Sequence, residues 1–521
     1  MIKNIVIVGG GTAGWMTASA FVKHLPKSCK IRLIESDAIA TVGVGEATIP
    51  VIRQFNSILG IDEREFMSKT NASFKLGIRF ENWAHRGDSY DHAFGYYGIP
   101  MNDVSFHHYW VKQHQQGKGG NIEDYNVPAV ASEEQRYAHR QYNDSRFDSR
   151  YFYAFQFDAS LYAQFLRNWS TSRGVTRTEG KVQEIFQNQE TGYITSILLE
   201  SGEKVSADLF IDCTGFRGIL INQTMGVNFR DWSHWLPCNR AWAVSSSYPS
   251  ADSSIPPYTR ARALEAGWQW RIPLQNRSGD GNVFCCDFIS EERGREQLLE
   301  NIEGDPLNEP RLLKFTTGMR ERLWDKNCVA IGLSAGFLEP LESTSIALIQ
   351  ATIMIFLKNF PDKDFDSIRR DEFNRRMVNK YEESRNFLIL HYHAIQREDT
   401  EFWKYCKNMS VPDELRHRLD LFKETGYVSN LASDLFLEHN WLAVLFGQDI
   451  VPTNYDLRVN KVSDEESLAS MESMSSEISN VIQEMPTHNQ TLADYCAGDL
   501  ISLIKSTNTA PTVDGVVQEH D

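Results

Sequence analysis

The pattern Gly9-x-Gly11-x-x-Gly14 is the feature that most restricts how this chain can fold. It follows a β-branched run at residues 5–8 and precedes a helix-like stretch at residues 15–25. Glycines in this order allow a tight turn, a close approach of a diphosphate and tight packing of helix on strand. A second apolar run, at residues 31–34, ends in Glu35, where a ribose hydroxyl would need an acceptor. We therefore expect a βαβ unit that binds a dinucleotide.

The same α/β pattern returns at residues 206–212 and 328–332. We expect an α/β fold with a Rossmann-type dinucleotide-binding body in three pieces, residues 1–80, 151–225 and 325–360. The other expected parts are an inserted substrate-binding segment (81–150), a sheet region (226–324), a mainly helical substrate-binding part (361–505) and a polar tail (506–521). The acidic stretch 464–484 has apolar residues at helical spacing and predicts a surface helix.

Charge and cysteine content exclude several classes of protein. The chain has 53 Lys and Arg against 69 Asp and Glu, a net charge of −16, whereas a nucleic-acid binder needs a cationic face. Its eight cysteines are irregularly spaced and form no Cys-x-x-Cys pair, so we expect neither structural zinc nor a disulfide framework. No apolar run is long enough to span a bilayer. These observations predict an intracellular protein of the reducing cytoplasm, without a membrane partner.

Later segments point to FAD as the dinucleotide. Residues 208–218 and 328–336 resemble the two later flavin-contacting segments of FAD monooxygenases, and there is no second Gly-x-Gly-x-x-Gly for a nicotinamide. The resemblance implies a bound FAD in a monooxygenase-like body, with reduced flavin supplied from outside. The residues expected to hold FAD are Gly9, Gly11, Thr12, Ala13, Gly14, Glu35, Ala47, Gly332 and Leu333.

Three further segments identify a family. They are GVGEATIP at residues 43–50, GWQWRIP at 267–273 and FLEPLESTS at 337–345. Together they closely resemble the flavin-dependent tryptophan halogenases, of which W-x-W-x-I-P is a hallmark. The similarity runs from residue 5 to about residue 452. It implies that FADH2 and oxygen convert a bound chloride or bromide into hypohalous acid, and that a separate NAD(P)H-dependent flavin reductase supplies the FADH2.

The resemblance also assigns catalytic residues. Lys75 matches the lysine that receives hypohalous acid through an internal tunnel, and Glu342 matches the catalytic glutamate. Glu342 would polarise the electrophile with Lys75 or take the ring proton; Lys75 would act as an ammonium donor or as a haloamine. The tunnel residues are Trp268, Trp270, Ile272 and Pro273. The halide would bind backbone N–H groups of Thr344 and Ser345, at the start of a helix expected at 346–360.

The substrate pocket departs from that of tryptophan-specific relatives. His92 and Phe94 match the residues that sandwich an indole, and Ile78, Phe436, Trp441 and Leu442 complete the expected pocket. A Tyr-Tyr pair that helps to hold the amino-acid backbone of tryptophan is replaced within 440–445, so both hydroxyls are missing. An amino-acid ammonium and carboxylate would then lack partners. We expect indole or a simply substituted indole to be a better substrate than tryptophan.

Ordinary structural alternatives remain for each of these residues. Without the resemblance, Lys75 reads as a solvated lysine opposite an inward strand face formed by Phe74, Leu76, Ile78 and Phe80. Glu342 could simply favour a helix N-terminus, and the two tryptophans could be core indoles. His391-Tyr392-His393 and His107-His108 are expected to be structural, and no metal site is expected. The chain at 332–336 reads Gly-x-Ser-x-Gly, but no helix follows the serine at once, so no nucleophile is expected.

Two rival functions stay open. An FAD-dependent aromatic hydroxylase shares the fold but has no need of Lys75 with Glu342. A non-catalytic flavin-binding protein would reduce and reoxidise FAD without product. The ring position, the preferred halide and homodimer formation are left open as well.

Overall fold

Strand β1 (Asn4–Val8) lies inside a six-stranded sheet of the computed structural model, which describes residues 2–38, 45–139, 146–147, 150–431 and 434–496. The strand order is β20-β21-β12-β1-β2-β8, and all neighbours are parallel except β20 and β21. The other strands are β2 (Lys30–Glu35), β8 (Thr176–Glu179), β12 (Leu209–Asp212), β20 (Trp324–Asp325) and β21 (Cys328–Ala330). The predicted α/β class is confirmed, and strands from distant stretches of the chain meet in one sheet.

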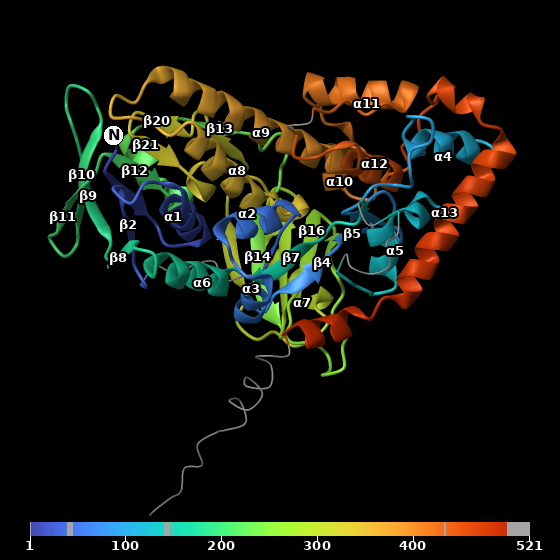
Figure 1. The fold of residues 1–521 in the computed structure, drawn as a ribbon, viewed down its shortest axis with the longest axis horizontal. Coiled ribbons are helices and arrows are strands. Elements are labelled where there is room, and N and C mark those ends of the chain that lie inside the picture. The colour runs from blue at the N-terminus through green and yellow to red at the C-terminus, as the bar shows by residue number, and fades with distance from the viewer. Residues whose placement is uncertain (1, 39–44, 140–145, 148–149, 432–433, 497–521) are drawn as a thin grey trace, which may run out of the picture.

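Helix α1 (Thr12–His24) packs on β1 and β2 and is covered by α6 (Ala159–Thr171) and α8 (Thr344–Lys358). Because α1 is enclosed on all sides, it is buried without a break from Gly14 to Phe21 rather than amphipathic. It begins three residues before the predicted stretch. Figure 1 shows this sheet and its helices at the end of the molecule that carries the N-terminus.

A seven-stranded sheet forms the middle of the molecule, in the order β18-β14-β17-β16-β15-β5-β6. Its strands are β5 (Gly77–Glu81), β6 (Ser89–Ala93), β14 (Arg240–Ser246), β15 (Tyr258–Ala263), β16 (Gly267–Pro273), β17 (Ser278–Phe284) and β18 (Arg311–Lys314). The central strands β16 and β17 are buried along their whole length. Gly281 lies opposite Trp270, and a Cβ on Gly281 would lie 2.0 Å from the indole. Glycine therefore lets Trp270 lie flat against the neighbouring strand.

The strand predicted around Lys75 is divided between two sheets. β4 (Ser73–Lys75) pairs with β7 (Ala154–Asp158), which also pairs with β3 (Gly45–Ala47), whereas β5 joins the large sheet. Phe74 and Ile78 are buried as predicted, but Lys75 is buried too. The prediction of one inward and one open face is wrong because both faces of this segment are covered.

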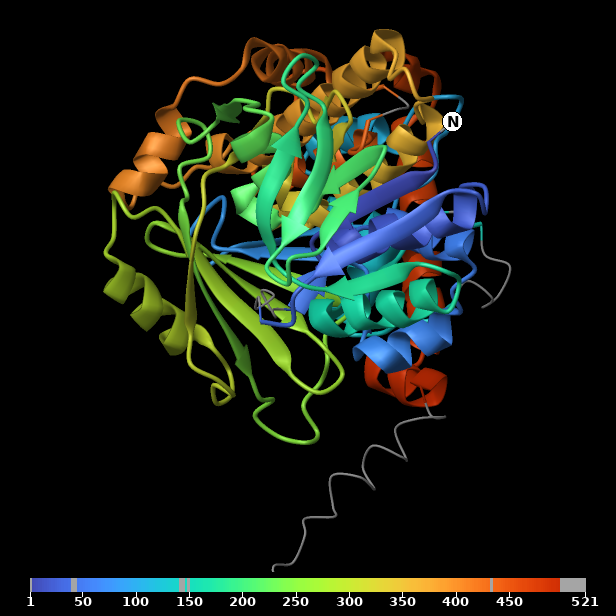
Figure 2. The ribbon, with the colours of Figure 1, turned by 90° about the vertical axis from the view of Figure 1, so that its left-hand side faces the viewer.

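The remaining strands form two smaller sheets. β9 (Val182–Gln187), β10 (Ile194–Leu199) and β11 (Lys204–Ser206) form an antiparallel sheet that stands out at the N-terminal end in Figures 1 and 2. β13 (Phe229–Asp231), β19 (Gly318–Arg320) and β22 (Gly336–Phe337) form the other. β22 leads directly into the segment that holds Glu342.

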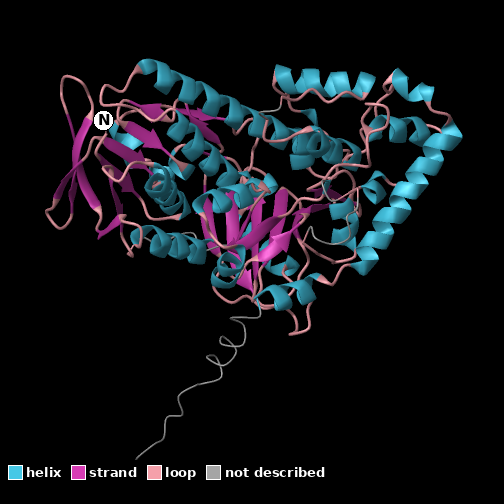
Figure 3. Cartoon of the chain, viewed as in Figure 1, coloured by secondary structure: helices cyan, strands magenta, loops and turns pink. Residues whose placement is uncertain are grey.

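The described elements after Pro361 are helices: α9 (Ser367–His393), α10 (Glu401–Asn408), α11 (Asp413–Thr425), α12 (Glu438–Gly447), the short η7 (Leu457–Lys461) and α13 (Asp464–Glu484). Figure 3 shows most of them gathered at the end opposite the six-stranded sheet, with α9 running between the two ends. α13 occupies the stretch predicted as a surface helix. It packs against α4 (Phe106–His114) and α5 (Val127–Glu133). The predicted tail at 506–521 lies outside the described residues.

The remaining α-helices of the described residues are α2 (Val51–Leu59), α3 (Glu63–Thr70) and α7 (Glu291–Asn301), and the short helical turns are η1 (Ile122–Tyr125), η3 (Gly215–Arg217), η4 (Ile219–Thr224) and η5 (Gly332–Ser334). Within the described part of the chain, no helix combines the length and the apolar character that crossing a lipid bilayer would require.

Candidate active site

The glycine turn has the geometry that a dinucleotide needs. Gly9 adopts a φ of +110°, and a Cβ there would lie 2.2 Å from the carbonyl oxygen of Cys213. A Cβ on Gly14 would lie 1.9 Å from the carbonyl oxygen of Gly9, so glycine allows α1 to pack against the turn. Gly11 is the N-cap of α1, without a side-chain cap and without an acid in the first turn. The first N–H groups of α1 are thus left for an anionic ligand.

A cavity of about 1390 Å³ lies over this turn. Most of the residues predicted to hold FAD line it: Gly9, Gly11, Thr12, Ala13, Glu35, Ala47, Gly332 and Leu333. Gly14 has the packing role instead. The first two residues of GVGEATIP, Gly43 and Val44, lie outside the described residues. A large cavity, a glycine-lined turn and an uncapped helix N-terminus fit FAD.

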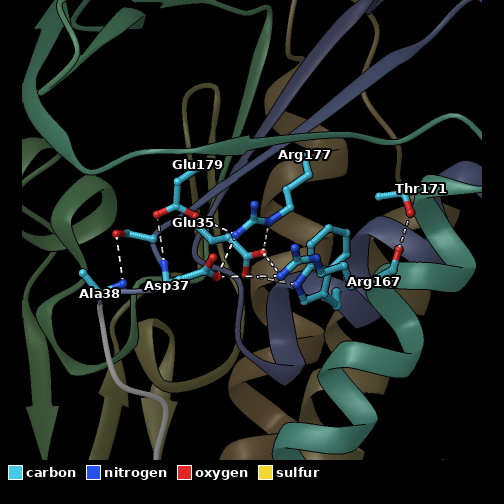
Figure 4. Close-up of polar contacts among 9 residues, drawn as sticks. Glu35, Asp37, Ala38, Arg167, Thr171, Arg177 and Glu179 are labelled. Carbon is cyan, nitrogen blue, oxygen red and sulfur yellow. Dashed lines mark hydrogen bonds and ion pairs between the residues drawn. The ribbon is translucent and has the colours of Figure 1, made fainter. Parts of the chain in front are cut away.

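Glu35 ends β2 at the rim of this cavity, and Figure 4 shows Arg177 and Arg167 pointing at its carboxylate. Arg177 Nε donates to Oε1 at 2.6 Å, and Arg167 Nη1 lies 3.4 Å from the same oxygen. Trp15 Nε1 donates to Oε2 at 3.2 Å. A carboxylate oxygen has two lone pairs, so a ribose hydroxyl could still donate to Glu35. No local pattern indicated the two arginines, which α6 and β8 bring from far along the chain.

Lys75 is buried beside the other predicted catalytic residue. Its side chain is 0% exposed, and Nζ donates to Ser343 Oγ at 2.8 Å. Nζ also lies 5.3 Å from the centroid of the Phe94 ring. Burial lowers the pKa of Lys75 to about 7, and the nearby carboxylate of Glu342 opposes that shift only in part. The alternative of a solvated strand lysine is therefore wrong.

Glu342 is held between two histidines. It ends the short 3₁₀ turn η6 (Pro340–Glu342), and its oxygens lie 2.8 and 2.9 Å from His92 Nδ1. His391 Nε2 lies 2.7 Å from Oε1. Burial by itself would raise the pKa of Glu342, but the interactions with His92 and His391 outweigh burial and lower the pKa to about 2. The carboxyl group is therefore ionised throughout the neutral range.

Aromatic side chains from the predicted pocket surround this pair. The rings of His92 and Phe94 lie 6.4 Å apart and nearly perpendicular. Phe436 stacks at 3.9 Å on Phe387, which also contacts the Trp441 ring at 5.3 Å. The structure thus brings four of the predicted pocket residues together with Lys75 and Glu342. Phe387, on α9, was not predicted, because a phenylalanine in an apolar helix face has no distinguishing signal.

The other two predicted pocket residues lie at the edges of this cluster. Ile78 pairs with His92 across β5 and β6. Leu442 lines a second cavity of about 250 Å³, together with Tyr96 and His439, whose rings are 4.5 Å apart. Burial, with a smaller contribution from His92, lowers the pKa of His439 to about 3. This cavity therefore adjoins the His92 side of the cluster.

The residues predicted to line the tunnel form a wall between the large cavity and the aromatic cluster around Lys75 and Glu342. Trp270 and Ile272 line the large cavity, and Trp268 lies 6.2 Å from Trp270, ring to ring. Pro273 ends the same strand, β16. All four are buried or nearly so.

Glu339 fixes this wall to the segment that carries Glu342. Trp268 Nε1 and the Tyr392 hydroxyl donate to Glu339 Oε2 at 3.0 and 2.7 Å. Burial raises the pKa of Glu339 to about 7, against the lowering effect of these two hydrogen bonds. This anchoring role was not predicted for Glu339, although it lies inside the FLEPLESTS segment.

The predicted halide site is at the N-terminus of α8. The N-cap is Ser343, in a left-handed conformation (φ 56°) and without a side-chain cap. Ser343 and Ser345 line the large cavity. Thr344 Oγ1 is buried and has no hydrogen-bond partner among the described residues. The turn thus leaves N–H groups at the cavity for a small anion.

His391 corrects the sequence interpretation. It was expected to be structural, yet it contacts Glu342 directly. His92, Glu342 and His391 offer ligand atoms within 4.8 Å of one another, a grouping that could hold a metal ion where none was predicted. The sequence could not reveal it, because β6, η6 and α9 supply one residue each.

Comparison with known sequences adds to this geometry. The sequence family described as tryptophan halogenase matches residues 4–464. The tryptophan 6-halogenase ThaL of Streptomyces albogriseolus is 37% identical over 441 residues, which are 81% of this chain and 82% of that protein. The tryptophan 7-halogenase RebH of Lentzea aerocolonigenes is 35% identical over 451 residues, 83% of this chain and 84% of that protein.

Solved structures extend the similarity to nearly the whole chain. Xcc4156, a flavin-dependent halogenase from Xanthomonas campestris, is 42% identical with a TM-score of 0.91, covering 95% of this chain and 99% of its own. BrvH, a flavin-dependent halogenase from Brevundimonas sp. BAL3, is 39% identical with a TM-score of 0.92 and the same coverage.

Proposed function

This chain belongs to the tryptophan halogenase family, and we propose that it halogenates indole or a simple indole derivative in preference to free tryptophan. Family membership makes it an oxidoreductase that halogenates a tryptophan-like aromatic with the help of a flavin. The choice of substrate, the halide and the roles of the individual residues are the proposal.

One observation carries the proposal. Lys75 and Glu342 are both fully buried, and Ser343 joins them, because it follows Glu342 in the chain and accepts a hydrogen bond from Lys75 Nζ at 2.8 Å. Ser343 also lines the large cavity, and the centroid of the Phe94 ring lies 5.3 Å from the amine. An oxidant that forms in the cavity would thus meet Lys75 before it meets the aromatic pocket.

FAD, when bound in reduced form, supplies the two electrons that activate oxygen so that halide can be oxidised to hypohalous acid. Gly9, Gly11 and the N-terminus of α1 would hold its diphosphate, and Glu35 its ribose. A separate NAD(P)H-dependent flavin reductase would supply FADH2, as the family resemblance implies.

The protein residues then control where the halogen goes. The backbone at Thr344 and Ser345 would hold chloride or bromide at the uncapped N-terminus of α8. Lys75 would receive the hypohalous acid and direct it to the ring. Trp268 and Trp270 would keep the substrate away from the flavin side. Ser345 stands where the family usually has glycine, so its side chain would change the size of the halide site, and the choice between chloride and bromide stays open.

Glu342 would act mainly through its charge. Attack of an aromatic ring on an electrophilic halogen produces a cationic ring, and a buried anion stabilises charge that develops beside it. The pKa of about 2 makes Glu342 a weak proton acceptor. We therefore favour electrostatic stabilisation over removal of the ring proton as its main contribution.

The stretch at 440–445 offers few partners for an amino-acid backbone. Asn440 and Trp441 lie in the stretch that replaces the tyrosine pair. The Asn440 side chain is already occupied, since Oδ1 accepts from Leu437 N at 2.8 Å and Nδ2 contacts His92 Nε2 at 3.0 Å. The adjoining cavity of about 250 Å³ is below the usual size for drug-like ligands, which favours a small substrate, although Arg150 and Glu438 are among the residues that line it. ThaL and RebH carry tryptophan in their names, whereas Xcc4156 and BrvH are named only as halogenases.

The proposal is tested by supplying the purified protein with FAD, a flavin reductase with NADH, oxygen, bromide or chloride, and a panel of indoles. We expect products in which one halogen replaces one hydrogen, identified by mass spectrometry. A hydroxylase would instead add oxygen to the substrate whether or not bromide is present. Repeated reduction and reoxidation of FAD without any modified aromatic would indicate a non-catalytic flavoprotein.

We expect turnover of indole to exceed turnover of free tryptophan by at least tenfold in kcat/KM. The physical reason is the loss of hydrogen-bonding partners for a buried ammonium and carboxylate, which costs roughly 1–3 kcal/mol for each unpaired polar group. Competition between equal concentrations of the two substrates in one vessel gives the ratio directly. Equal turnover, or a preference for tryptophan, would contradict the proposed substrate class without contradicting halogenation.

A further inference from the structure

His391 faces two hydrogen-bond acceptors at once. Its Nδ1 lies 2.8 Å from the carbonyl oxygen of Phe387, and its Nε2 lies 2.7 Å from Glu342 Oε1. A carbonyl oxygen can only accept, so Nδ1 carries a proton. Lone pairs on Nε2 and on the carboxylate oxygen would repel each other at 2.7 Å, so one of the two atoms carries a proton. The angle at Nε2 is poor for a hydrogen bond, so the contact is mainly an ion pair.

Asn440 fixes the protonation of the other histidine. Because Leu437 N–H must donate, Oδ1 of Asn440 faces Leu437 at 2.8 Å and Nδ2 faces His92 Nε2 at 3.0 Å. His92 Nε2 therefore accepts, and its proton is on Nδ1, which donates to Glu342. His92 is neutral in this arrangement. A metal ion would need the lone pair on Nδ1, so these bond directions favour a held proton over a metal ligand.

The three side chains together carry no net charge. Glu342 contributes one negative charge, His391 one positive charge and His92 none. The net charge of the three side chains is also zero if the shared proton moves from His391 to Glu342. His391 therefore reduces the negative charge that Lys75 meets, although Lys75 lies beside a carboxylate.

We propose that His391 is a positioning residue that holds the proton balancing Glu342, and that it thereby keeps Lys75 as a free amine. This inference rests on the proposed roles of Lys75 and Glu342. The free amine places no second cation beside the cationic ring that forms during halogenation. It is also the form that can take halogen from hypohalous acid: an N–halogen bond forms as the O–halogen bond breaks, and one amine proton leaves with the oxygen as water.

Other titratable groups near the cluster come from several elements. They are Tyr90 on β6, Glu339 before η6, Tyr392 on α9 and His439 on α12. Burial raises the pKa of both tyrosines well above the usual value and lowers that of His439 to about 3, so these three are neutral near pH 7. Glu339, with a pKa of about 7, is partly ionised there. None of them supplies the positive charge assigned to His391.

The test follows the ionisation of Lys75 directly. In protein labelled with ¹³C at lysine Cε, the Lys75 signal is assigned by its loss in Lys75→Arg, and its shift is recorded against pH. We expect a midpoint near pH 7 in the unchanged enzyme. In His391→Gln we expect it to rise by about one pH unit or more, because glutamine offers N–H donors but no positive charge and leaves Glu342 uncompensated. Halogenation by this variant should fall at pH 7 and recover at higher pH.

Two variants separate charge from structural damage. His393→Gln, on the same helix two residues further on, should leave the Lys75 midpoint unchanged. The double variant His391→Gln with Glu342→Gln removes both charges, so its midpoint should return to, or fall below, that of the unchanged enzyme; distortion would not be reversed by a second substitution.

An unshifted midpoint in His391→Gln overturns the inference. So does a midpoint above about 9 in the unchanged enzyme, which decides the question even if His391→Gln fails to fold. The titration needs neither substrate nor halide, so it stands whether or not the halogenation assay succeeds. A failed assay with the expected midpoints would contradict the proposed function alone.

Discussion

Replacing Lys75 with alanine is expected to abolish halogenation while reduced FAD continues to react with oxygen. The amine is fully buried, donates to Ser343, which lines the large cavity, and lies 5.3 Å from the centroid of the Phe94 ring. Its removal leaves hypohalous acid without a group that directs it to the ring. The loss should be roughly 1000-fold or more, the order seen when a group acting on reacting atoms is removed. Product formation by mass spectrometry and hydrogen peroxide release are measured in parallel.

Lys75→Arg sharpens this experiment, because arginine keeps the positive charge and the N–H donors but does not become a neutral amine. If an ammonium that donates to hypohalous acid is sufficient, this variant should retain measurable activity. If a free amine is required, it should be as inactive as Lys75→Ala. Lys27→Ala, which changes an exposed lysine, serves as the control. Near-normal halogenation by Lys75→Ala would remove Lys75 from the mechanism.

Replacing Glu342 with glutamine is expected to lower kcat by roughly 100- to 1000-fold, the range for loss of one preorganised electrostatic contact to the transition state. Glutamine has nearly the same shape but no charge, so the cationic ring would lose its stabilising anion. FAD affinity should be unchanged, because Glu342 is not among the residues that line the large cavity. Single-turnover product formation and FAD titration measure the two effects.

Glu342→Asp is the matched variant, since it keeps the charge and shortens the side chain by one methylene. It should retain more activity than Glu342→Gln if charge is the main contribution. The reverse order, with glutamine more active than aspartate, would indicate that Glu342 acts by filling space and holding His92 and His391. A rate close to that of the unchanged enzyme in both variants would refute the catalytic assignment.

Local sequence was sufficient to predict the glycine turn and the strand and helix around it. Gly9, Gly11 and Gly14 restrict the backbone within a few residues, and their roles follow from the absence of a side chain. The start of α8 was predicted to within two residues because polar residues there precede an apolar helix. The fold class follows from such local signals, repeated at each strand of the sheet.

Contacts between residues that are far apart in the chain could not be predicted from local sequence. The pairing of His391 with Glu342, and of Arg177 with Glu35, joins elements that are far apart in the chain. Nothing in His-x-His distinguishes a ring that meets a buried carboxylate from one that does not. The burial of Lys75 was missed for a related reason: alternation predicts one covered face, whereas Ser343 and Phe94, from other parts of the chain, cover the Lys75 face as well.

Strand β16 separates the large cavity from the aromatic cluster around Glu342, and this partition has a further consequence. Trp270 lies flat over Gly281 in the middle of a fully buried strand pair, so this partition is rigid. In the proposed function, the oxidant would form on the side of the large cavity, whereas the groups that would select a ring come from β6, α9 and α12 on the other side. Substitutions on that second side could then change the aromatic acceptor while the residues around the large cavity stay the same.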